Sequence, residues 1–323
     1  MKKILGMGNA LVDIMIRIDD DTFLNLLELP KGSMQLVDSA RSKSVLGKFE
    51  NHPKSFSAGG SAANTIHGLA MLGVPAGYIG VIGEDELGGS FVKDMINAGV
   101  EPHMIHSLQN TGHAIALVTP DSERTFATFL GAAIELTAEH LEGFNFKQYD
   151  YLHLEGYLVQ NHELVKTALS LAKKNGLTVS LDLASYNVVE ENLEFLRDIV
   201  GKYVDIVFAN EEEAKAFTGK EPLEALDEIA AMTDIAVVKI GSKGSLVKRG
   251  KEMVEIGVIT VTPVDTTGAG DLYASGFLYG QSLGLSLKKC GELGALLAGN
   301  VIGVIGSKMG AEKWNEIREI IKS

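Results

Sequence analysis

Cysteine is almost absent from this sequence. Cys290 is its only cysteine, so no intrachain disulfide can form, and neither a CxxC pair nor a zinc-binding cysteine cluster exists. We interpret Cys290 as a small residue of the core, the usual place of a free cysteine.

Long apolar runs are missing as well. No stretch of about 18 uninterrupted apolar residues occurs, so we expect no membrane span. The chain opens with Met1-Lys2-Lys3 and turns apolar, as a signal peptide would, but Asn9, Asp13 and Arg17 interrupt the run too early. We therefore expect a cytoplasmic protein without a membrane partner.

Positive charge is scarce relative to negative charge. The chain has 29 lysines and arginines against 42 aspartates and glutamates, a formal net charge of −13. Such a surface repels the phosphate backbone of DNA or RNA, so we expect no nucleic-acid partner. A small anion such as a nucleotide remains compatible, because backbone dipoles can bind phosphate locally against the overall field.

Familiar nucleotide and metal motifs are absent or incomplete. No GxxxxGK[ST] sequence exists, which excludes a P-loop kinase, and the eight histidines form no HExxH motif. Gly6-Met7-Gly8 follows a predicted strand and suggests a dinucleotide fingerprint. However, Leu11 stands at the third glycine position, and no acidic residue plainly closes the unit. A Rossmann oxidoreductase is therefore weakly supported.

What the sequence does have is material for a large core, since 46 % of its 323 residues are hydrophobic. Short, uninterrupted apolar runs suit strands buried on both faces, and helical segments alternate with them. This alternation predicts an α/β fold with a mostly parallel sheet flanked by helices. The expected strands are residues 3–7, 76–82, 151–154, 178–183, 206–209 and 236–240, and the expected helices are 62–72, 91–98, 162–175 and 272–283.

Two stretches break the alternation, residues 14–38 and 112–129. The second alternates apolar and polar side chains on either side of a turn at 119–121, which is typical of a hairpin. We predict one domain over 1–323, with a small β lid formed by about 14–56 and 106–130 inserted in it. An exposed face of such a sheet could pair with a second copy of the chain, or extra helices could cover it.

The strongest local pattern is a glycine-rich turn at residues 265–271 that runs into a predicted helix. Glycines allow a tight turn and a close approach of backbone to a ligand. The amides of Gly268, Ala269 and Gly270 would then lie at a helix N-terminus, which attracts an anion. Asp271 would lie beside that anion, where a base is needed. The alternative is an ordinary N-cap aspartate after a flexible loop.

Residues 265–271 and the helix after them resemble the second signature of the ribokinase-like (PfkB) family of carbohydrate and nucleoside kinases. GGSAAN at 59–64 resembles the first signature of that family, and NEEE at 210–213 resembles its Asn-x-x-Glu element. The opening GNALVD at 8–13 resembles the adenosine kinase branch. Family elements are also matched at 80–88 and 239–244, and all of these matches occur in family order.

The resemblance implies a role for each matching position. Asp271 is similar to the catalytic base, with Gly268, Ala269 and Gly270 as the anion hole for the transferring phosphate. Glu213, with Asn210, is similar to the pair that organises Mg²⁺ through water. The acceptor hydroxyls would be held by Asn9, Asp13, Gly59, Gly60 and Asn64. The nucleotide would be held by Asn210, Lys239, Ser242, Gly244 and Thr266.

Structural alternatives remain open for these residues. Asn9 and Asp13 could end a strand and cap a turn, and residues 59–61 could be a loop that feeds a helix. Residues 211–213 could be a solvated first helical turn. Arg124, in the hairpin, could approach the phosphates or be a solvated charge. An apolar base pocket could be lined by Leu11, Phe126 and Phe129, although aromatic residues at strand spacing are more often core.

The resemblance implies a kinase that uses ATP and Mg²⁺, and a monovalent cation such as K⁺ near Asp265 and Thr267 stays open. The expected acceptor is adenosine, phosphorylated on its 5′-hydroxyl to give AMP and ADP. The alternatives are a sugar kinase acting on ribose, fructose or a related carbohydrate, and a non-catalytic nucleoside or sugar sensor. The sequence leaves both a monomer and a homodimer open.

Overall fold

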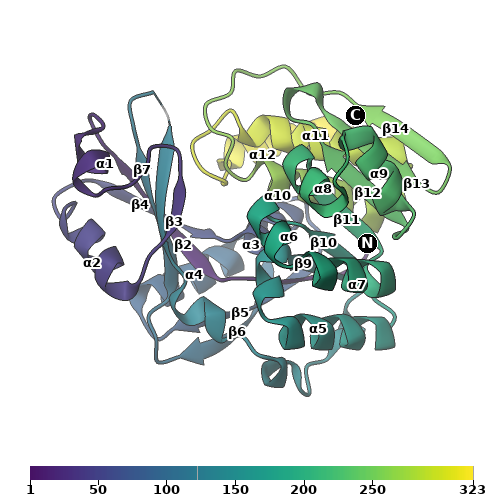
Figure 1. The fold of residues 1–323 in the computed structure, drawn as a ribbon, viewed down its shortest axis with the longest axis horizontal. Helices are drawn as coiled ribbons and strands as arrows, with labels where there is room; N and C mark the ends of the chain where they lie inside the picture. Colours follow the sequence, from purple (N-terminus) through teal and green to yellow (C-terminus); the bar gives the residue numbers. More distant parts are fainter. Residues whose placement is uncertain (122, 323) are drawn as a thin grey trace.

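The structure is a computed structural model and describes residues 1–121 and 123–322. Its centre is a nine-stranded sheet in the order β14-β13-β12-β11-β10-β9-β1-β5-β6 (Figure 1). Neighbours from β6 to β12 pair in parallel, while β13 and β14 add an antiparallel edge. The strands are β1 (Ile4–Met7), β5 (Ala76–Gly83), β6 (Val100–Ser107), β9 (Tyr151–Glu155), β10 (Thr178–Asp182), β11 (Ile206–Asn210), β12 (Ile235–Lys239), β13 (Ser245–Arg249) and β14 (Glu252–Ile256).

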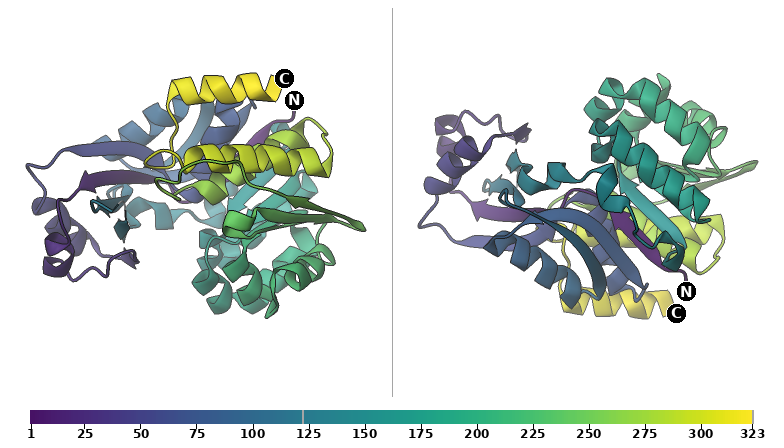
Figure 2. Two further views of the ribbon diagram at one scale, coloured as in Figure 1. Left: turned by 90° about the horizontal axis from the view of Figure 1, so that it is seen from above. Right: turned by 90° about the horizontal axis from the view of Figure 1, so that it is seen from below.

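Helices cover both faces of this sheet, because its central strands are apolar on both sides. Figure 2 shows the sheet between two helical layers. One layer contains α3 (Ser61–Met71), α4 (Glu86–Asn97), α10 (Ala269–Ser282) and α11 (Leu287–Val301). The other contains α5 (His162–Lys174), α7 (Leu193–Tyr203), α8 (Glu211–Thr218) and α9 (Pro222–Ala230), with the short α6 (Tyr186–Glu191) beside α8. The last helix, α12 (Ala311–Lys322), packs on α11 through Trp314. The predicted fold class is confirmed.

A second, five-stranded sheet stands off one side of the core, at the left of Figure 1. Its order is β3-β8-β7-β2-β4, with β2 (Leu11–Arg17), β3 (Met34–Leu36), β4 (Lys54–Gly59), β7 (Gly112–Val118) and β8 (Arg124–Phe129). We call it the small sheet. The predicted hairpin is the antiparallel pair β7–β8, although Ser122 in its turn lies outside the described residues.

Alternation along β2 explains how the small sheet is covered. Val12, Ile14 and Ile16 are buried with apolar residues of α1 (Thr22–Leu26) and α2 (Ser39–Gly47), whereas Leu11 and Asp13 face the opposite way. Of the two possibilities left open for this sheet, the structure shows helices covering one face. In the described part of the chain, no helix is both long and apolar enough to cross a bilayer.

Two predicted helix starts were wrong. The helix expected from residue 91 begins at Glu86, because Asp85 caps it and accepts a hydrogen bond from the Gly88 amide at 2.9 Å. The helix expected from residue 272 begins at Ala269, with Gly268 as its N-cap. In both cases glycines lie within the first helical turn or at the cap.

Candidate active site

Adjacent parallel strands of the core end in polar residues at one edge of the sheet. The last residues of β9, β10, β11 and β12 are Glu155, Asp182, Asn210 and Lys239, and Asn9 follows the end of β1. The carboxyl ends of parallel strands lie at the same edge of a sheet, which is where open α/β folds bind ligands. Strand register thus gathers residues that are far apart in the sequence.

The glycine-rich turn forms a cradle for an anion at this edge. Gly268, with φ of 75°, caps α10, and Ala269, Gly270 and Asp271 make up its first turn. The amides at the start of α10 and the helix dipole favour a negative charge, although the Ala269 amide already donates to the Thr266 carbonyl oxygen at 3.2 Å. A Cβ atom on Gly270 would lie only 3.0 Å from Lys239 Nζ, so the ammonium group faces the same turn. Backbone amides and a cation at one turn fit a phosphate group.

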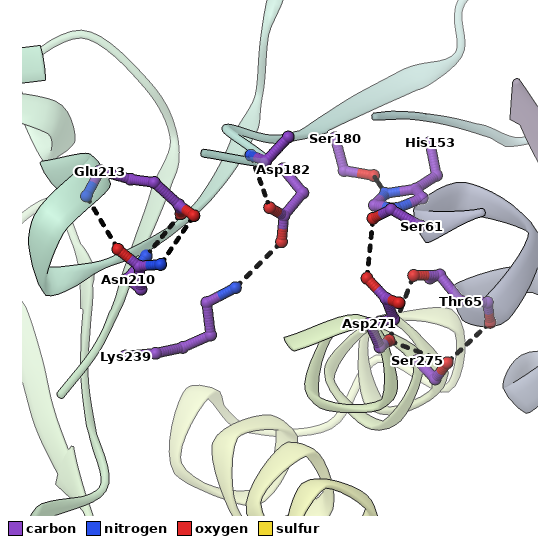
Figure 3. A network of polar contacts seen from close by, with 11 residues as sticks. Ser61, Thr65, His153, Ser180, Asp182, Asn210, Glu213, Lys239, Asp271 and Ser275 are labelled. Atoms are coloured by element: carbon purple, nitrogen blue, oxygen red, sulfur yellow. Dashed lines mark hydrogen bonds and ion pairs between the residues drawn. The ribbon is translucent and has the colours of Figure 1, made fainter. Parts of the chain in front are cut away.

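Asp271 lies in the turn that forms this cradle, and two side chains of α3 hold its carboxylate; Figure 3 shows one of them, Ser61. Ser61 Oγ donates to Asp271 Oδ1 at 2.7 Å, and Asn64 Nδ2 donates to Oδ2 at 2.9 Å. Asn64 is itself oriented by Ser307, whose hydroxyl donates to Asn64 Oδ1 at 3.0 Å. Burial raises the pKa of Asp271 to about 6, and the hydrogen bonds from Asn64 and Ser61 oppose that rise. Asp271 is therefore mostly ionised at neutral pH and oriented for proton transfer.

Lys239 and Asp182 form a buried ion pair beside the cradle. Lys239 Nζ lies 3.0 Å from Asp182 Oδ2, and the side chains are 16 % and 7 % exposed. Burial lowers the pKa of Lys239, but the carboxylates of Asp182, Glu213 and Asp271 outweigh it, so the pKa is raised. Lys239 thus carries a positive charge where phosphate would bind, and Asp182 fixes its direction.

Asn210 and Glu213 form a reciprocal cap at the start of α8. Asn210 Oδ1 accepts from the Glu213 amide at 2.8 Å, Glu213 Oε2 accepts from the Asn210 amide at 2.7 Å, and Asn210 Nδ2 donates to Glu213 Oε1 at 2.7 Å. Glu213 is 3 % exposed, so the alternative of a solvated first turn is wrong for this residue. Burial, followed by the charge of Asp182, raises the pKa of Glu213 to about 7.

This donor set can be tested against Mg²⁺. No group of three or more histidine, cysteine or acidic residues gathers to hold a metal ion among the residues that the structure describes. Both oxygens of Glu213 already accept one hydrogen bond each, and the lone pairs that remain could accept from waters bound to the ion. Mg²⁺ commonly keeps several waters and binds through one or two carboxylates and substrate phosphates. The residues therefore fit a water-mediated Mg²⁺ on a nucleotide, and not an all-protein cage.

A cavity of about 620 Å³ opens between the core and the small sheet. Its polar floor includes Asn9, Gly60, Ser61 and Glu155. Its apolar wall comes from the small sheet and the segment that follows it: Leu11, Ala114, Leu130, Ala133, Ile134 and Leu136. Cavities of this size take small organic ligands, and a mixed lining favours a molecule with one polar and one apolar part.

Of the five acceptor residues predicted from the sequence, Asn9 and Gly60 line this cavity, whereas Asp13, Gly59 and Asn64 are not among its lining residues. Gly60 has φ of 97°, and a Cβ there would lie 2.2 Å from the Asn9 carbonyl oxygen, so only glycine fits. Asp13, on β2, packs over Gly59, where a Cβ would lie 2.6 Å from its carboxylate. Burial raises the pKa of Asp13 to about 6, and the cations Lys308 and Arg124 oppose that rise.

Of the two possibilities left open for the aromatic residues of the hairpin, packing within the sheet describes them better than a base pocket. Leu11 lines the cavity, but Phe126 and Phe129 are not among its lining residues. The Phe129 ring instead packs against His113, with 5.4 Å between the centroids. Both phenylalanines lie on β8, and half-buried packing within the small sheet explains them, as the alternative reading held.

Three predicted nucleotide residues lie in turns rather than at the cavity. Ser242 is exposed in the 3₁₀ turn η5 (Gly241–Lys243), just after β12. Gly244 has φ of 98°, and a Cβ there would lie 1.9 Å from the Ile256 carbonyl oxygen, so strand packing alone requires glycine. Thr266 is exposed in the loop before α10. Their proximity to Lys239 and to the cradle leaves a nucleotide contact as a prediction.

Two buried acids of the site, Glu155 and Asp182, were missed from the sequence. Each is the last residue of a parallel strand, and that position is the only sequence signal that could have found them. Arg124 was placed only as one of two possibilities. It is buried, forms an ion pair with Asp265 and donates to Thr267 Oγ1 at 3.0 Å, so the solvated alternative is wrong.

Comparison with known proteins agrees with this geometry. The sequence profile described as pfkB family carbohydrate kinase matches residues 40–314. The crystal structure of an adenosine kinase from Sinorhizobium meliloti has a TM-score of 0.89 and 35 % identity, covering 99 % of each chain. An adenosine kinase of Schizophyllum commune is 26 % identical over 98 % of both chains. An uncharacterized sugar kinase of Archaeoglobus fulgidus is 28 % identical over 75 % of this chain and 97 % of its own.

Proposed function

Since the chain belongs to the pfkB family of carbohydrate kinases and is a phosphotransferase that acts on a hydroxyl group, we propose that its acceptor is adenosine, phosphorylated on the 5′-hydroxyl. ATP would be the donor, and the products would be AMP and ADP. The observation that carries this proposal is the cavity, whose polar floor leads to Asp271 while its wall is apolar. A nucleoside has a hydroxyl-rich ribose and a flat base that match these two parts.

The residues of the site divide the work of phosphoryl transfer. The 5′-hydroxyl would donate to Asp271, which takes the proton while the acceptor oxygen bonds to the γ-phosphorus and ADP leaves. The amides of Gly268, Ala269 and Gly270, with Lys239, would neutralise the charge on the transferring group. When bound, Mg²⁺ would neutralise further phosphate charge. Positioning and charge neutralisation are the main contributions that this reaction asks of a protein.

The ribose would be held at the floor of the cavity. Asn9 lines the floor, while Asp13 lies against Gly59 and Asn64 against Gly60, outside the lining. Their side chains carry donors and acceptors that suit vicinal hydroxyls, and Gly60 lets the backbone come close. The base would lie against Leu11 and the rest of the apolar wall. A free sugar would leave that wall without a partner and would forfeit the burial of the base.

We further propose that the small sheet acts as a lid over the cavity. Its strands β2, β7 and β8 contribute Leu11, Ala114 and Thr128 to the cavity lining, so any movement of the sheet changes access to the acceptor. Closure would exclude water from the reacting phosphate.

The test is a side-by-side measurement of kcat/KM for adenosine, ribose and fructose, each with ATP and Mg²⁺. We expect adenosine to be preferred and 2′-deoxyadenosine to be much poorer, since a site built for a hydroxyl strongly rejects an analogue without it. Asp13→Ala should remove most of that discrimination. A preference for ribose or fructose would overturn the adenosine proposal and support a sugar kinase. Binding of adenosine without turnover would support a sensor.

A further inference from the structure

One buried carboxylate at the cavity floor has no part in the mechanism above. Glu155, the last residue of β9, is 1 % exposed. Its Oε1 accepts a hydrogen bond from the Asn9 amide and its Oε2 accepts one from the Ala62 amide, both at 2.9 Å. A single side chain therefore joins two segments that are more than 50 residues apart in the sequence.

Both of these segments carry functional side chains. Asn9 belongs to the turn between β1 and β2, at the polar floor of the cavity. Ala62 lies in the first turn of α3, between Ser61 and Asn64, the two residues whose side chains hold the carboxylate of Asp271. The Glu155 carboxylate is thus linked to the acceptor turn on one side and, through α3, to the base on the other.

We propose that Glu155 is a positioning residue that sets the acceptor turn at a fixed distance from the Asp271 base. The inference rests on the proposed roles of Asn9 and Asp271. The local sequence leaves room for this arrangement: a Cβ on Gly8 would lie 2.3 Å from Glu155 Oε2 and 2.8 Å from Ala62 Cβ. Gly8 therefore lets the carboxylate reach both amides.

The arrangement depends on ionisation, because both oxygens must accept. Protonation would turn one oxygen toward an N–H group as a donor and break that hydrogen bond. Burial raises the pKa of Glu155 to about 7; the Ala62 and Asn9 amides oppose the rise, and the charge of Asp271 adds to it. The other titratable groups that it interacts with are Tyr78 of β5 and Tyr157 of η4 (Gly156–Gln160). As the pH falls through about 7, the acceptor turn should loosen and the acceptor KM should rise.

The first experiment uses Glu155→Gln, in which one acceptor oxygen becomes an NH₂ group. We expect the KM for adenosine to rise by about tenfold or more, the effect of losing a hydrogen bond to a charged group, while the KM for ATP changes less than about twofold. The rise of the acceptor KM near pH 7 should disappear, leaving the titration of Asp271. The matched control is Asp150→Asn. Asp150 lies just before β9, away from the site, and its carboxylate accepts a hydrogen bond from the Lys3 amide at 2.8 Å.

The second experiment does not depend on the acceptor. Hydrogen exchange of the Asn9 and Ala62 amides should be faster in Glu155→Gln than in the wild type, while the interior of β9 stays protected. Gly8→Ala, which pushes on the carboxylate without removing its charge, should show the same pattern and serves if Glu155→Gln does not fold. Unchanged exchange at both amides, or an unchanged acceptor KM, would overturn the proposal. Faster exchange in an enzyme that rejects adenosine would overturn the acceptor assignment alone.

Discussion

At the scale of single residues, the site contains acids that are buried where the charged form of the side chain is disfavoured. Burial raises the pKa of Asp13 and Asp271 to about 6, and that of Glu155 and Glu213 to about 7. A carboxylate whose pKa is raised to about 6 is a stronger base than an exposed one and is still mostly ionised at neutral pH, whereas one whose pKa is about 7 is only partly ionised there. Of the four, Asp271 alone lies in the first turn of α10 among the amides of the cradle, which separates its role from the others.

The role of Asp271 predicts a defined loss and a defined pH dependence. Asp271→Asn keeps the size of the side chain and a hydrogen bond with α3, so the fold and nucleotide binding should persist. Turnover should fall on the order of a hundredfold or more, because the proton acceptor is gone. In the wild type, kcat should fall as the pH drops through about 6, since protonation removes the base. Steady-state kinetics from pH 5 to 8 measure both effects; near-normal turnover of Asp271→Asn would remove it from the mechanism.

The proposed base could be named from the sequence because the cradle beside it is local. Asp271 and the amides of Gly268, Ala269 and Gly270 are consecutive, so one motif specifies the cradle. Glu155 and Asp182 give no such signal, because a single acid after an apolar run looks like any strand end. They are brought together only by strand register, which pairs Glu155 of β9 with Asp182 of β10. Their function is a property of the sheet and not of a motif.

At the scale of elements, the small sheet and the loop before α10 are tied by one arginine. Arg124 begins β8, and its guanidinium forms an ion pair with Asp265 and donates to Thr267. Asp265 also accepts from the Gly306 amide at 2.6 Å and from the Thr267 amide at 3.0 Å, so its carboxylate organises the loop that leads into the cradle. Through this pair the position of the small sheet is linked to the shape of the phosphate site.

Removing the arginine should therefore disturb both stability and catalysis. Arg124→Ala leaves a buried carboxylate without its cation, which costs on the order of 3 kcal/mol in the free energy of unfolding. We expect kcat/KM to fall by about tenfold or more as the loop loses its anchor. Arg124→Lys keeps the charge but not the fork of donors, and should be intermediate. The control is Arg17→Ala, an exposed arginine at the end of β2, measured by thermal unfolding and kinetics.

This prediction would be contradicted by an Arg124→Ala variant that is as stable and as active as Arg17→Ala.

The sequence could place Arg124 in a hairpin, because the alternation from Gly112 to Phe129 is local. It could not reveal the partner, since Asp265 lies far along the chain and the contact exists only when the two sheets are in place. The same limit applied to the starts of α4 and α10, where caps, and not propensity, set the first residue.

At the scale of the whole molecule, the cavity lies between two bodies built in different ways. The core sheet is mostly parallel and covered on both faces, and α10, one of the helices that cover it, carries the proposed base and the cradle. The small sheet is mixed, is covered by α1 and α2 on one face, and contributes the apolar wall. The acceptor would contact both bodies, whereas the phosphate cradle belongs to the core. Binding energy from the base can then hold the small sheet closed, as a lid requires.

If closure needs the acceptor, the lid stays open when ATP is bound alone. ATP should then escape hydrolysis only because the catalytic arrangement is incomplete. We therefore expect ATP hydrolysis without acceptor to be slower than about one hundredth of the transfer rate. Adenosine should lower the exchange of amides in β2 and β7, while ATP alone should protect the loop before α10. A coupled assay for ADP formation, with and without acceptor, measures the first effect, and hydrogen exchange measures the second. Rapid hydrolysis of ATP alone would contradict a lid, and so would equal protection of β2 with and without adenosine. In either case the small sheet would be closed or open regardless of what the cavity holds.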